Sequence, residues 1–147
     1  MLLQIHFDLL HLNYLLAPFA EFILRVILGV LFFFQGYDKI FNLKISGVVE
    51  TFQMDFENKK IPRFFLLFAA YFSSYTEILS GLLLILGFLR FYALCALGLD
   101  LLLVSVAFSV LQPMWDMRHV FPRLLFLIAL LVMPSQWFMF GLDKLFS

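Results

Sequence analysis

Long apolar runs separated by short polar segments dominate the chain. Each of the four longest runs approaches or exceeds the roughly 18 residues that an α-helix needs to cross the hydrocarbon core of a bilayer. The pattern therefore predicts four membrane-spanning helices. We expect them at about residues 18–36, 62–87, 91–111 and 119–137.

Two further segments carry apolar and polar residues at helical spacing. In residues 2–16 the polar side chains fall on one helical face among leucines, namely Gln4, Asp8 and His11. This pattern predicts a helix lying at the membrane interface and ended by Pro18. Residues 44–60 predict a second amphipathic helix on the membrane surface, between spans one and two.

Composition supports a membrane protein. Of the 147 residues, 64% are hydrophobic and 14% are charged, whereas a soluble domain has about 45–50% apolar and about 25% charged residues. We therefore expect residues 1–147 to form a single transmembrane domain, an all-α integral membrane four-helix bundle. The formal net charge of zero gives no general attraction to nucleic acid, so we expect membrane lipid and no nucleic acid among the partners.

Basic residues are distributed unevenly between the two sides of this predicted bundle. Most of those outside the spans follow spans one and three: Lys39, Lys44, Lys59, Lys60, Arg63, Arg118 and Arg123. The other side holds Arg90 and Lys144. Because cytoplasmic loops are enriched in Lys and Arg, we expect both termini to lie on the side away from the cytoplasm.

Three ionisable residues, Arg25, Glu77 and Asp100, lie within the predicted spans. A charge at the centre of a membrane helix costs about 2.5–3.5 kcal/mol on insertion scales, so such groups pair or face a polar interior. At 1.5 Å per residue, Arg25 lies about 10 Å below the terminal-side surface, and the two carboxylates lie about 15 Å below it. We therefore predict one polar layer in which Arg25 contacts Glu77. Asp100 shares this layer or faces a partner protein.

Small and polar residues accompany the predicted layer at helical spacing. They are Gly29, Gly36 and Lys39 on span one, and Ser73 and Gly81 on span two. Small residues let membrane helices approach closely. Two interpretations stay open: an ion pair that only fixes helix register, or a site for a polar head group or a proton.

The charges of this layer do not balance, because two carboxylates face one arginine. Protonation of Asp100, or compensation by Lys39, Tyr75 or a ligand, restores the balance. We expect Lys39 to lie too near the opposite surface to serve the layer. No catalytic residue can be named, and no metal site is predicted, because His6, His11 and His119 lack ligand spacing. Cys95 stands alone in an apolar run, and we expect it to be passive.

Several motifs resemble the DoxX family of small four-helix bacterial membrane proteins. The first is R-x3-G-x6-G-x2-K, formed by Arg25, Gly29, Gly36 and Lys39. The second lies in TEILSGLLLILGFLR and comprises Glu77, Gly81, Gly87 and Arg90. Pro62 opens span two, and Gly141–Asp143 (Gly-Leu-Asp) stands where the family usually has a small residue and Ser-Leu-Asp. The resemblance covers about residues 20–145. Asp100 and the helix before residue 18 depart from the pattern.

The resemblance implies a multi-pass protein of the bacterial inner (cytoplasmic) membrane. Together with the distribution of basic residues, this predicts that both termini lie in the periplasm. Family members have been tied to thiosulfate–quinone oxidoreduction as a small membrane subunit, and more distant relatives to assembly of other membrane proteins. We therefore expect a non-catalytic subunit that anchors or assembles a membrane or redox partner, with a protein partner or a homo-oligomer. The alternative is a quinone-linked oxidoreductase subunit in which the Arg25–Glu77 layer contacts a quinone or lipid head group.

Overall fold

A computed structural model of the chain describes residues 2–55, 62–111 and 117–145, and helices make up nearly all of these ranges. The elements are α1 (Leu2–Tyr37), the π-helical turn η1 (Asp38–Asn42), α2 (Lys44–Asp55), α3 (Arg63–Leu86), α4 (Arg90–Leu111), α5 (Met117–Val132) and the 3-10 helices η2 (Ser135–Trp137) and η3 (Leu142–Leu145). The described ranges contain no strand. The all-α prediction is therefore confirmed.

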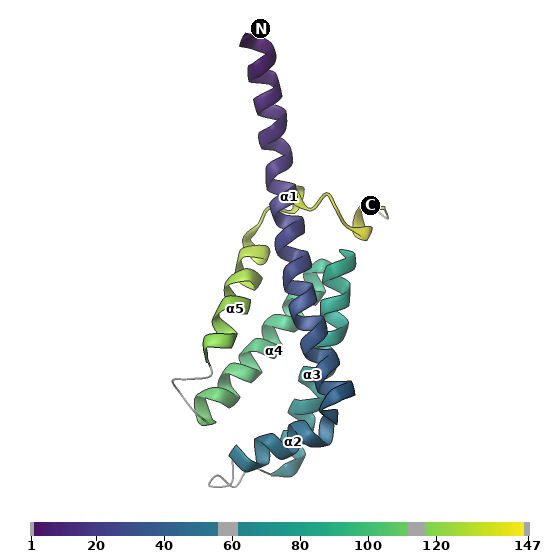
Figure 1. The fold of residues 1–147 in the computed structure, drawn as a ribbon, viewed down its shortest axis with the longest axis vertical. Coiled ribbons are helices and arrows are strands. Elements are labelled where there is room, and N and C mark those ends of the chain that lie inside the picture. Colours follow the sequence, from purple (N-terminus) through teal and green to yellow (C-terminus); the bar gives the residue numbers. More distant parts are fainter. Residues whose placement is uncertain (1, 56–61, 112–116, 146–147) are drawn as a thin grey trace.

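Three helical segments in the described part of the chain are long and apolar enough to cross a membrane: Tyr14–Asn42, Arg63–Leu86 and Arg90–Ala107. A shorter apolar helix, Val120–Val132, accompanies them. Figure 1 shows α1, α3, α4 and α5 running along one another, with α2 lying across one end of the bundle. This arrangement confirms the membrane helical bundle predicted from the apolar runs.

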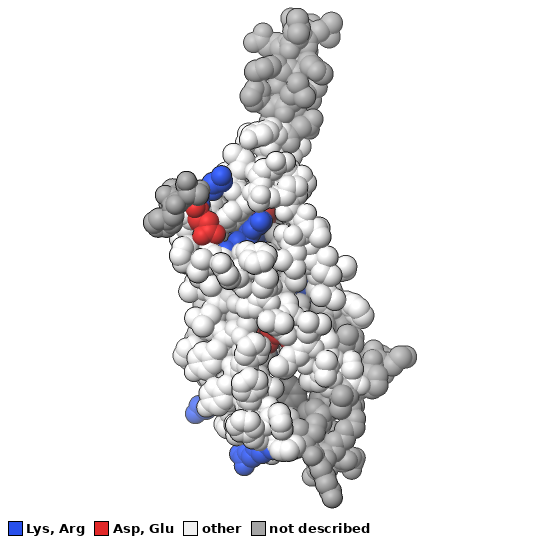
Figure 2. All heavy atoms as spheres, turned by 180° about the vertical axis from the view of Figure 1, so that it is seen from behind, with Lys and Arg blue, Asp and Glu red and all other residues white. Residues whose placement is uncertain are grey.

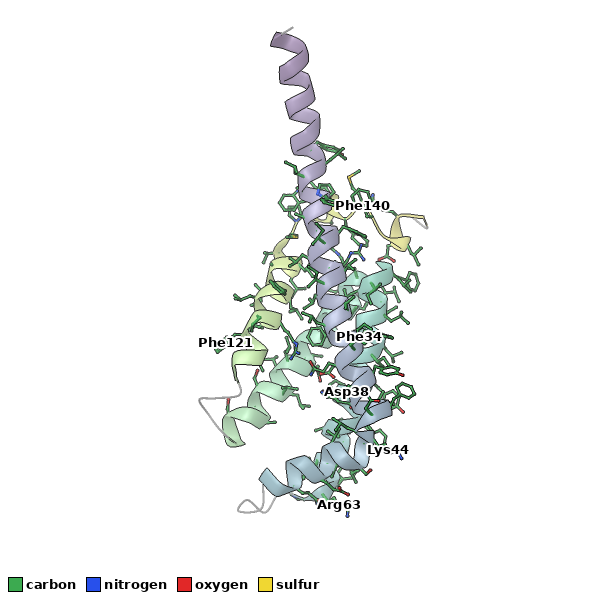
Figure 3. All side chains as sticks on the ribbon, in the orientation of Figure 1. Phe34, Asp38, Lys44, Arg63, Phe121 and Phe140 are labelled. Atoms are coloured by element: carbon green, nitrogen blue, oxygen red, sulfur yellow. The ribbon has the colours of Figure 1, made fainter. Side chains whose placement is uncertain are left out.

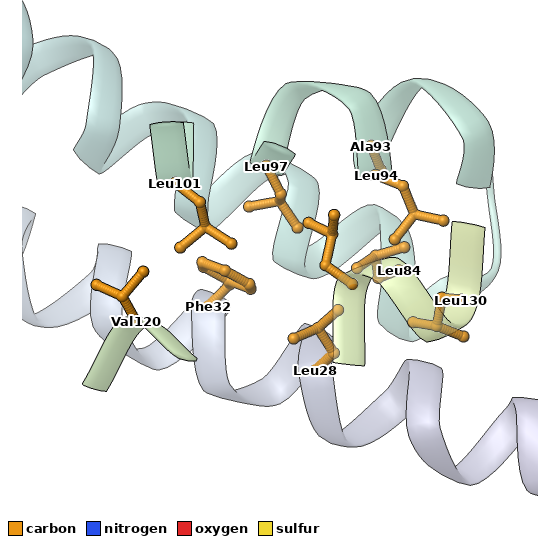
Figure 4. Packing of buried hydrophobic residues seen from close by; sticks show 10 residues of the cluster. Leu28, Phe32, Leu84, Ala93, Leu94, Leu97, Leu101, Val120 and Leu130 are labelled. Atoms are coloured by element: carbon orange, nitrogen blue, oxygen red, sulfur yellow. The ribbon is translucent and has the colours of Figure 1, made fainter. Parts of the chain in front are cut away.

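The bundle core joins all four long helices. α1 packs along α3, α4 packs on α3 and α5, and α5 also contacts α1. Figure 4 shows Leu28 and Phe32 of α1 meeting Leu84 of α3 and Leu97 of α4, which are all fully buried. Burial of such side chains in a close-packed core fixes the helices against one another.

The outer surface of the bundle is apolar. Large hydrophobic side chains remain exposed on every long helix, including Phe34 on α1, Phe64 on α3, Leu102 on α4 and Leu125 on α5. In Figure 2 the charged groups gather toward the two ends of the described body, and the surface between them is almost uncharged. Such a surface suits the hydrocarbon of a bilayer, so the chain associates with membrane lipid.

The prediction of a separate interfacial helix ending at Pro18 is wrong. α1 continues through Pro18 as one helix of 36 residues, and its N-terminal part extends beyond the rest of the bundle (Figure 1). Proline removes one backbone hydrogen bond from a helix. Breaking the helix among apolar residues would leave several backbone groups unpaired, at several kcal/mol each in hydrocarbon. The side chains of Gln4, Asp8 and His11 lie outside the described residues.

The fourth span is shorter than predicted. α5 ends at Val132 rather than at Trp137, and Trp137 lies in η2. The residue before a proline is disfavoured in the α-conformation, so Pro134 ends the helix at this point. At 1.5 Å per residue, the 16 residues of α5 reach about 24 Å.

The segment between spans one and two forms the predicted amphipathic helix over Lys44–Asp55, and residues 56–60 lie outside the described ranges. Lys44 has a positive φ of 57°, which lets the chain turn sharply between η1 and α2. One face of α2 is buried against the start of α3, where Val48 and Val49 pack on Leu66 and Ala70. α2 is thereby fixed to the bundle.

Candidate functional site

The three ionisable residues singled out from the sequence are all buried inside the bundle. Arg25 and Asp100 are 0% exposed, and Glu77 is 1% exposed. They do not form one layer, however. Arg25 belongs to a cluster near the end where the C-terminal segment lies, whereas Glu77 and Asp100 belong to a second cluster nearer α2.

The first cluster, which we call the Arg25 cluster, comprises Glu21, Arg25 and Arg90. The Nε of Arg25 lies 3.2 Å from Oε1 of Glu21, one helical turn away, and Nη1 of Arg90 lies 3.4 Å from the same oxygen. The two guanidinium groups also lie over the ring of Phe138, at 5.2 Å and 4.7 Å from its centroid. The carboxylate of Glu21 thus pairs with both arginines, and both guanidinium groups contact the ring of Phe138.

Arg25 also closes the end of α3. Its guanidinium donates hydrogen bonds to the backbone carbonyls of Leu84, Ile85 and Phe140. The last carbonyls of a helix have no partner within the helix, and the helix dipole makes that end negative. Arg25 therefore satisfies the C-terminus of α3 and attaches the segment around Phe140 to it. Figure 3 shows Phe140 beside α1, far from Lys44 and Arg63 at the other end.

The C-terminal Gly-Leu-Asp motif completes this end of the molecule. Asp143 accepts hydrogen bonds from the backbone N–H groups of Leu89 and Arg90, at 3.0 Å and 3.4 Å, and so caps the start of α4. Its own N–H donates to the carbonyl of Gly87 at 3.1 Å. Gly87 has a φ of 65°, and a Cβ there would lie 2.6 Å from the Cα of Gly141. Both glycines are needed for this close contact.

The second cluster, the Lys39 cluster, comprises Gln35 and Lys39 from the α1–η1 segment, Ser73 and Glu77 from α3, and Asp100 from α4. Nζ of Lys39 lies 2.8 Å from Oε1 of Glu77 and donates to Oγ of Ser73 at 3.0 Å. Nε2 of Gln35 donates to the same Glu77 oxygen at 2.6 Å. The pair is mostly dry, because the side chain of Lys39 is 19% exposed and that of Glu77 is 1% exposed.

Asp100 lies on the α4 side of this cluster. It is close enough for electrostatic interaction with Ser73, Lys39 and Arg123, and also with Glu77. Both of its carboxylate oxygens are fully buried, and neither has a donor in good hydrogen-bond geometry. The second oxygen of Glu77, Oε2, is in the same situation. The nearest donor to Asp100 is the hydroxyl of Ser73, whose single O–H serves either Glu77 or Asp100 but not both.

The predicted contact between Arg25 and Glu77 is therefore wrong. In the antiparallel α1–α3 pair, Arg25 lies level with Leu84, which is seven residues or about 10 Å along the helix from Glu77. Counted from a span that starts at residue 18, Arg25 was expected about 10 Å below the surface. In the structure its guanidinium donates to the carbonyl of Leu84, two residues before α3 ends, so Arg25 lies close to that end of the bundle. The ends of the two helices are not level, so equal distances from the ends do not give equal depth.

Lys39 is the residue that the sequence interpretation had set aside, and it is the partner of Glu77. The glycines expected to let spans one and two approach each other line the α1–α3 contact. A Cβ on Gly29 would lie 2.8 Å from the carbonyl oxygen of Gly81, and one on Gly36 would lie 2.6 Å from the backbone nitrogen of Ile78. They bring the two helices close enough for Lys39 and Gln35 to reach Glu77.

Three members of the two clusters were not predicted as site residues from the sequence: Glu21, Gln35 and Arg90. Two neighbours, Arg123 and Asp143, were not predicted as site residues either. Two of these five residues carried a usable signal. Glu21 and Gln35 each stand four residues before a basic residue, Arg25 and Lys39, on the same helical face. The contacts of Arg90 and Asp143 depend on how the C-terminal segment folds back, which no local spacing shows.

Within the described residues no group of three or more His, Cys, Asp or Glu side chains could hold a metal ion. Cys95 is an exposed free cysteine on α4. The buried polar side chains around Lys39 are therefore the strongest candidate for a functional site in the described part of the chain.

Comparison with known proteins agrees with the motifs. The model of the family described as DoxX matches residues 20–112, which is more than half of the chain. No curated protein and no solved structure matches. The matched region contains α1 from Ala20 onward, α2, α3 and α4, and so includes every member of the Lys39 cluster. The chain belongs to the DoxX family.

Proposed function

We propose that this DoxX-family protein is a non-catalytic membrane subunit that anchors or assembles a membrane or redox partner. The observation that carries this proposal is that the residues of the family motifs hold the helices together. Gly29, Gly36 and Gly81 bring the helices together, and Arg25 closes the end of α3. Residues that serve helix packing in this way favour a scaffold over an enzyme.

The proposed location is the bacterial inner membrane, with both termini in the periplasm. Lys44 and Arg63 lie together at the end of the bundle occupied by α2 (Figure 3), and Lys39 lies in the turn that leads to it. Lys59 and Lys60 belong to the same connection in the sequence but lie outside the described residues. An excess of lysine and arginine on one side favours a cytoplasmic position for that side.

A quinone-linked oxidoreductase subunit is the second candidate, and the Lys39 cluster favours it. A partly buried ammonium beside two buried carboxyl groups, within a helix bundle, is a polar site at membrane depth, and intramembrane ionisable residues often mark functional sites. In this alternative the head group contacts Lys39 and Glu77 rather than the Arg25–Glu77 layer expected from the sequence.

The test compares a deletion strain with strains that carry the wild-type chain or single variants. The scaffold proposal predicts that at least one membrane protein co-purifies with the chain and falls in abundance when the chain is deleted. Its level should recover with the wild type and with Lys44→Met, because Lys44 is exposed on α2. It should not recover with Arg25→Leu, which removes the side chain that donates to the carbonyls of Leu84, Ile85 and Phe140.

Solvent extraction of the purified protein tests the second candidate. That candidate predicts bound quinone that is lost in Lys39→Met and kept in Lys44→Met, an exposed lysine on α2 that serves as the matched control. Quinone retained by both variants contradicts a role for the cluster in binding. A chain that stabilises no other membrane protein contradicts the scaffold proposal.

A further inference from the structure

The hydrogen bonds of the Lys39 cluster are distributed unevenly over its two carboxyl groups. Gln35, Lys39 and Ser73 all direct a donor toward Oε1 of Glu77, at 2.6, 2.8 and 3.4 Å. Three other carboxylate oxygens receive none: Oε2 of Glu77 and both Oδ atoms of Asp100. The cluster therefore has more acceptors than donors.

This imbalance is costly in a membrane interior. An ionised carboxylate can only accept hydrogen bonds, whereas a protonated carboxyl group carries one O–H donor. A buried charge without hydrogen bonds is strongly unfavourable, and such a group commonly becomes neutral instead. One proton on the carboxyl pair would remove a charge and add a donor at the same time.

The charged groups around the pair come from each packed helix. Lys39 is in η1, Glu77 is on α3 and Asp100 is on α4. Arg123 of α5 acts on both carboxyl groups through space, and its guanidinium lies 5.9 Å from the centre of the Phe32 ring. Neither cation makes a hydrogen bond to Asp100, because both Asp100 oxygens lack a partner. Lys39 is committed to Glu77 and Ser73.

We infer that the Glu77–Asp100 pair is a proton-binding site inside the membrane, with the proton carried by Asp100. The proton comes from water on the side where Lys39 is partly exposed, adds to one Oδ of Asp100, and returns the same way when the pH rises. No electron moves and no other bond changes. This inference does not depend on the proposed scaffold function, because it concerns only groups within this chain.

Infrared spectroscopy of the full-length protein in lipid nanodiscs tests the proposal. A protonated carboxyl group absorbs at a different infrared frequency from a carboxylate. Carboxyl groups in water are ionised at neutral pH, so they do not contribute to the protonated band. We expect a protonated-carboxyl band at neutral pH that disappears as the solution becomes alkaline. The band should be absent in Asp100→Asn and displaced in Asp100→Glu. It should be unchanged in Asp38→Asn, the matched control, which removes an exposed carboxylate at the start of η1.

Other results would overturn the proposal. They are a wild-type protein without the band at neutral pH, and a band that survives Asp100→Asn. Should Asp100→Asn fail to fold, Asp100→Glu decides, because an unchanged band in that variant assigns the proton elsewhere. Thermal stabilisation by sodium ions that is lost in Asp100→Glu, together with no protonated band, would make the cluster a sodium site instead.

Discussion

The ammonium group of Lys39 lies 2.8 Å from Oε1 of Glu77 and joins η1, the turn that follows α1, to the middle of α3. The contact depends on the antiparallel register of these helices, in which Gly29 faces Gly81 and Gly36 faces Ile78. Helix packing and the polar site are thus consequences of the same contact surface. Changes in that surface should alter both.

Gly36→Ala should destabilise the protein, because a Cβ at residue 36 would lie 2.6 Å from the backbone nitrogen of Ile78 and 2.8 Å from the carbonyl oxygen of Ser74. Neither atom can move without moving α3. We expect the free energy of unfolding to fall by about 1–3 kcal/mol, which is the usual cost of overpacking. The fall should be seen as a lower Tm in detergent.

Gly47→Ala on α2 is the matched control for this substitution. Nothing lies within 4 Å of a Cβ at residue 47, and alanine favours a helix over glycine by about 1 kcal/mol. This variant should be as stable as the wild type or more stable. Equal losses from the two substitutions would show that the α1–α3 approach is not tight at Gly36.

Asp143→Ala should loosen the C-terminal segment, because the carboxylate that receives the N–H groups of Leu89 and Arg90 is removed. Loss of a helix cap costs about 0.5–2 kcal/mol. Hydrogen exchange should therefore increase at the start of α4. Lys144→Ala removes an exposed neighbouring side chain and should leave this exchange unchanged, and similar changes in the two variants would contradict the capping role.

Labelling of introduced cysteines should reveal the orientation of the chain in the membrane. In a Cys95→Ala background, which removes the only native thiol, Lys44→Cys should be protected from a membrane-impermeant reagent applied from the periplasm. Lys144→Cys should react with it, because the proposed topology places that residue outside. The opposite pattern would reverse the topology and place the Lys39 side in the periplasm.

The sequence was sufficient to predict the membrane bundle, because apolar runs of spanning length have few alternative structures. The buried state of Arg25, Glu77 and Asp100 followed from the same reasoning. Their partners did not, because pairing depends on the register between helices. α1 extends past the end of α3, and Arg25 lies beside Leu84 near that end, so a depth counted from an assumed start at residue 18 did not give the level of Arg25 on α3.

The Arg25 cluster was beyond prediction for another reason. Arg25 donates to the backbone carbonyls of Leu84, Ile85 and Phe140. Which carbonyls can accept such a bond depends on where a helix ends and not on residue type. The Gly-Leu-Asp motif was visible in the sequence, but its contact with Gly87 requires the C-terminal segment to fold back over the α3–α4 turn.

Arg25 and Glu77 should behave as independent sites. Arg25 acts at the C-terminus of α3, about two helical turns or 10 Å from Glu77. Reversible unfolding of Arg25→Leu, Glu77→Gln and the double variant should give losses that add to within about 0.3–0.5 kcal/mol, as is usual for separated positions. A coupling energy between Arg25 and Glu77 well above this range would support the direct contact that was expected from helix depth, and would contradict their separation.

The same measurement on Lys39 and Glu77 tests the central claim most directly. Removal of one member of a buried ion pair costs about 3–5 kcal/mol, because the other charge is left without its partner. Lys39→Met and Glu77→Gln should therefore each destabilise the protein, and the double variant should lose less than the sum, with a coupling of about 0.5–3 kcal/mol. Strictly additive losses for Lys39 and Glu77 would contradict the account that places the polar site of this protein at that pair.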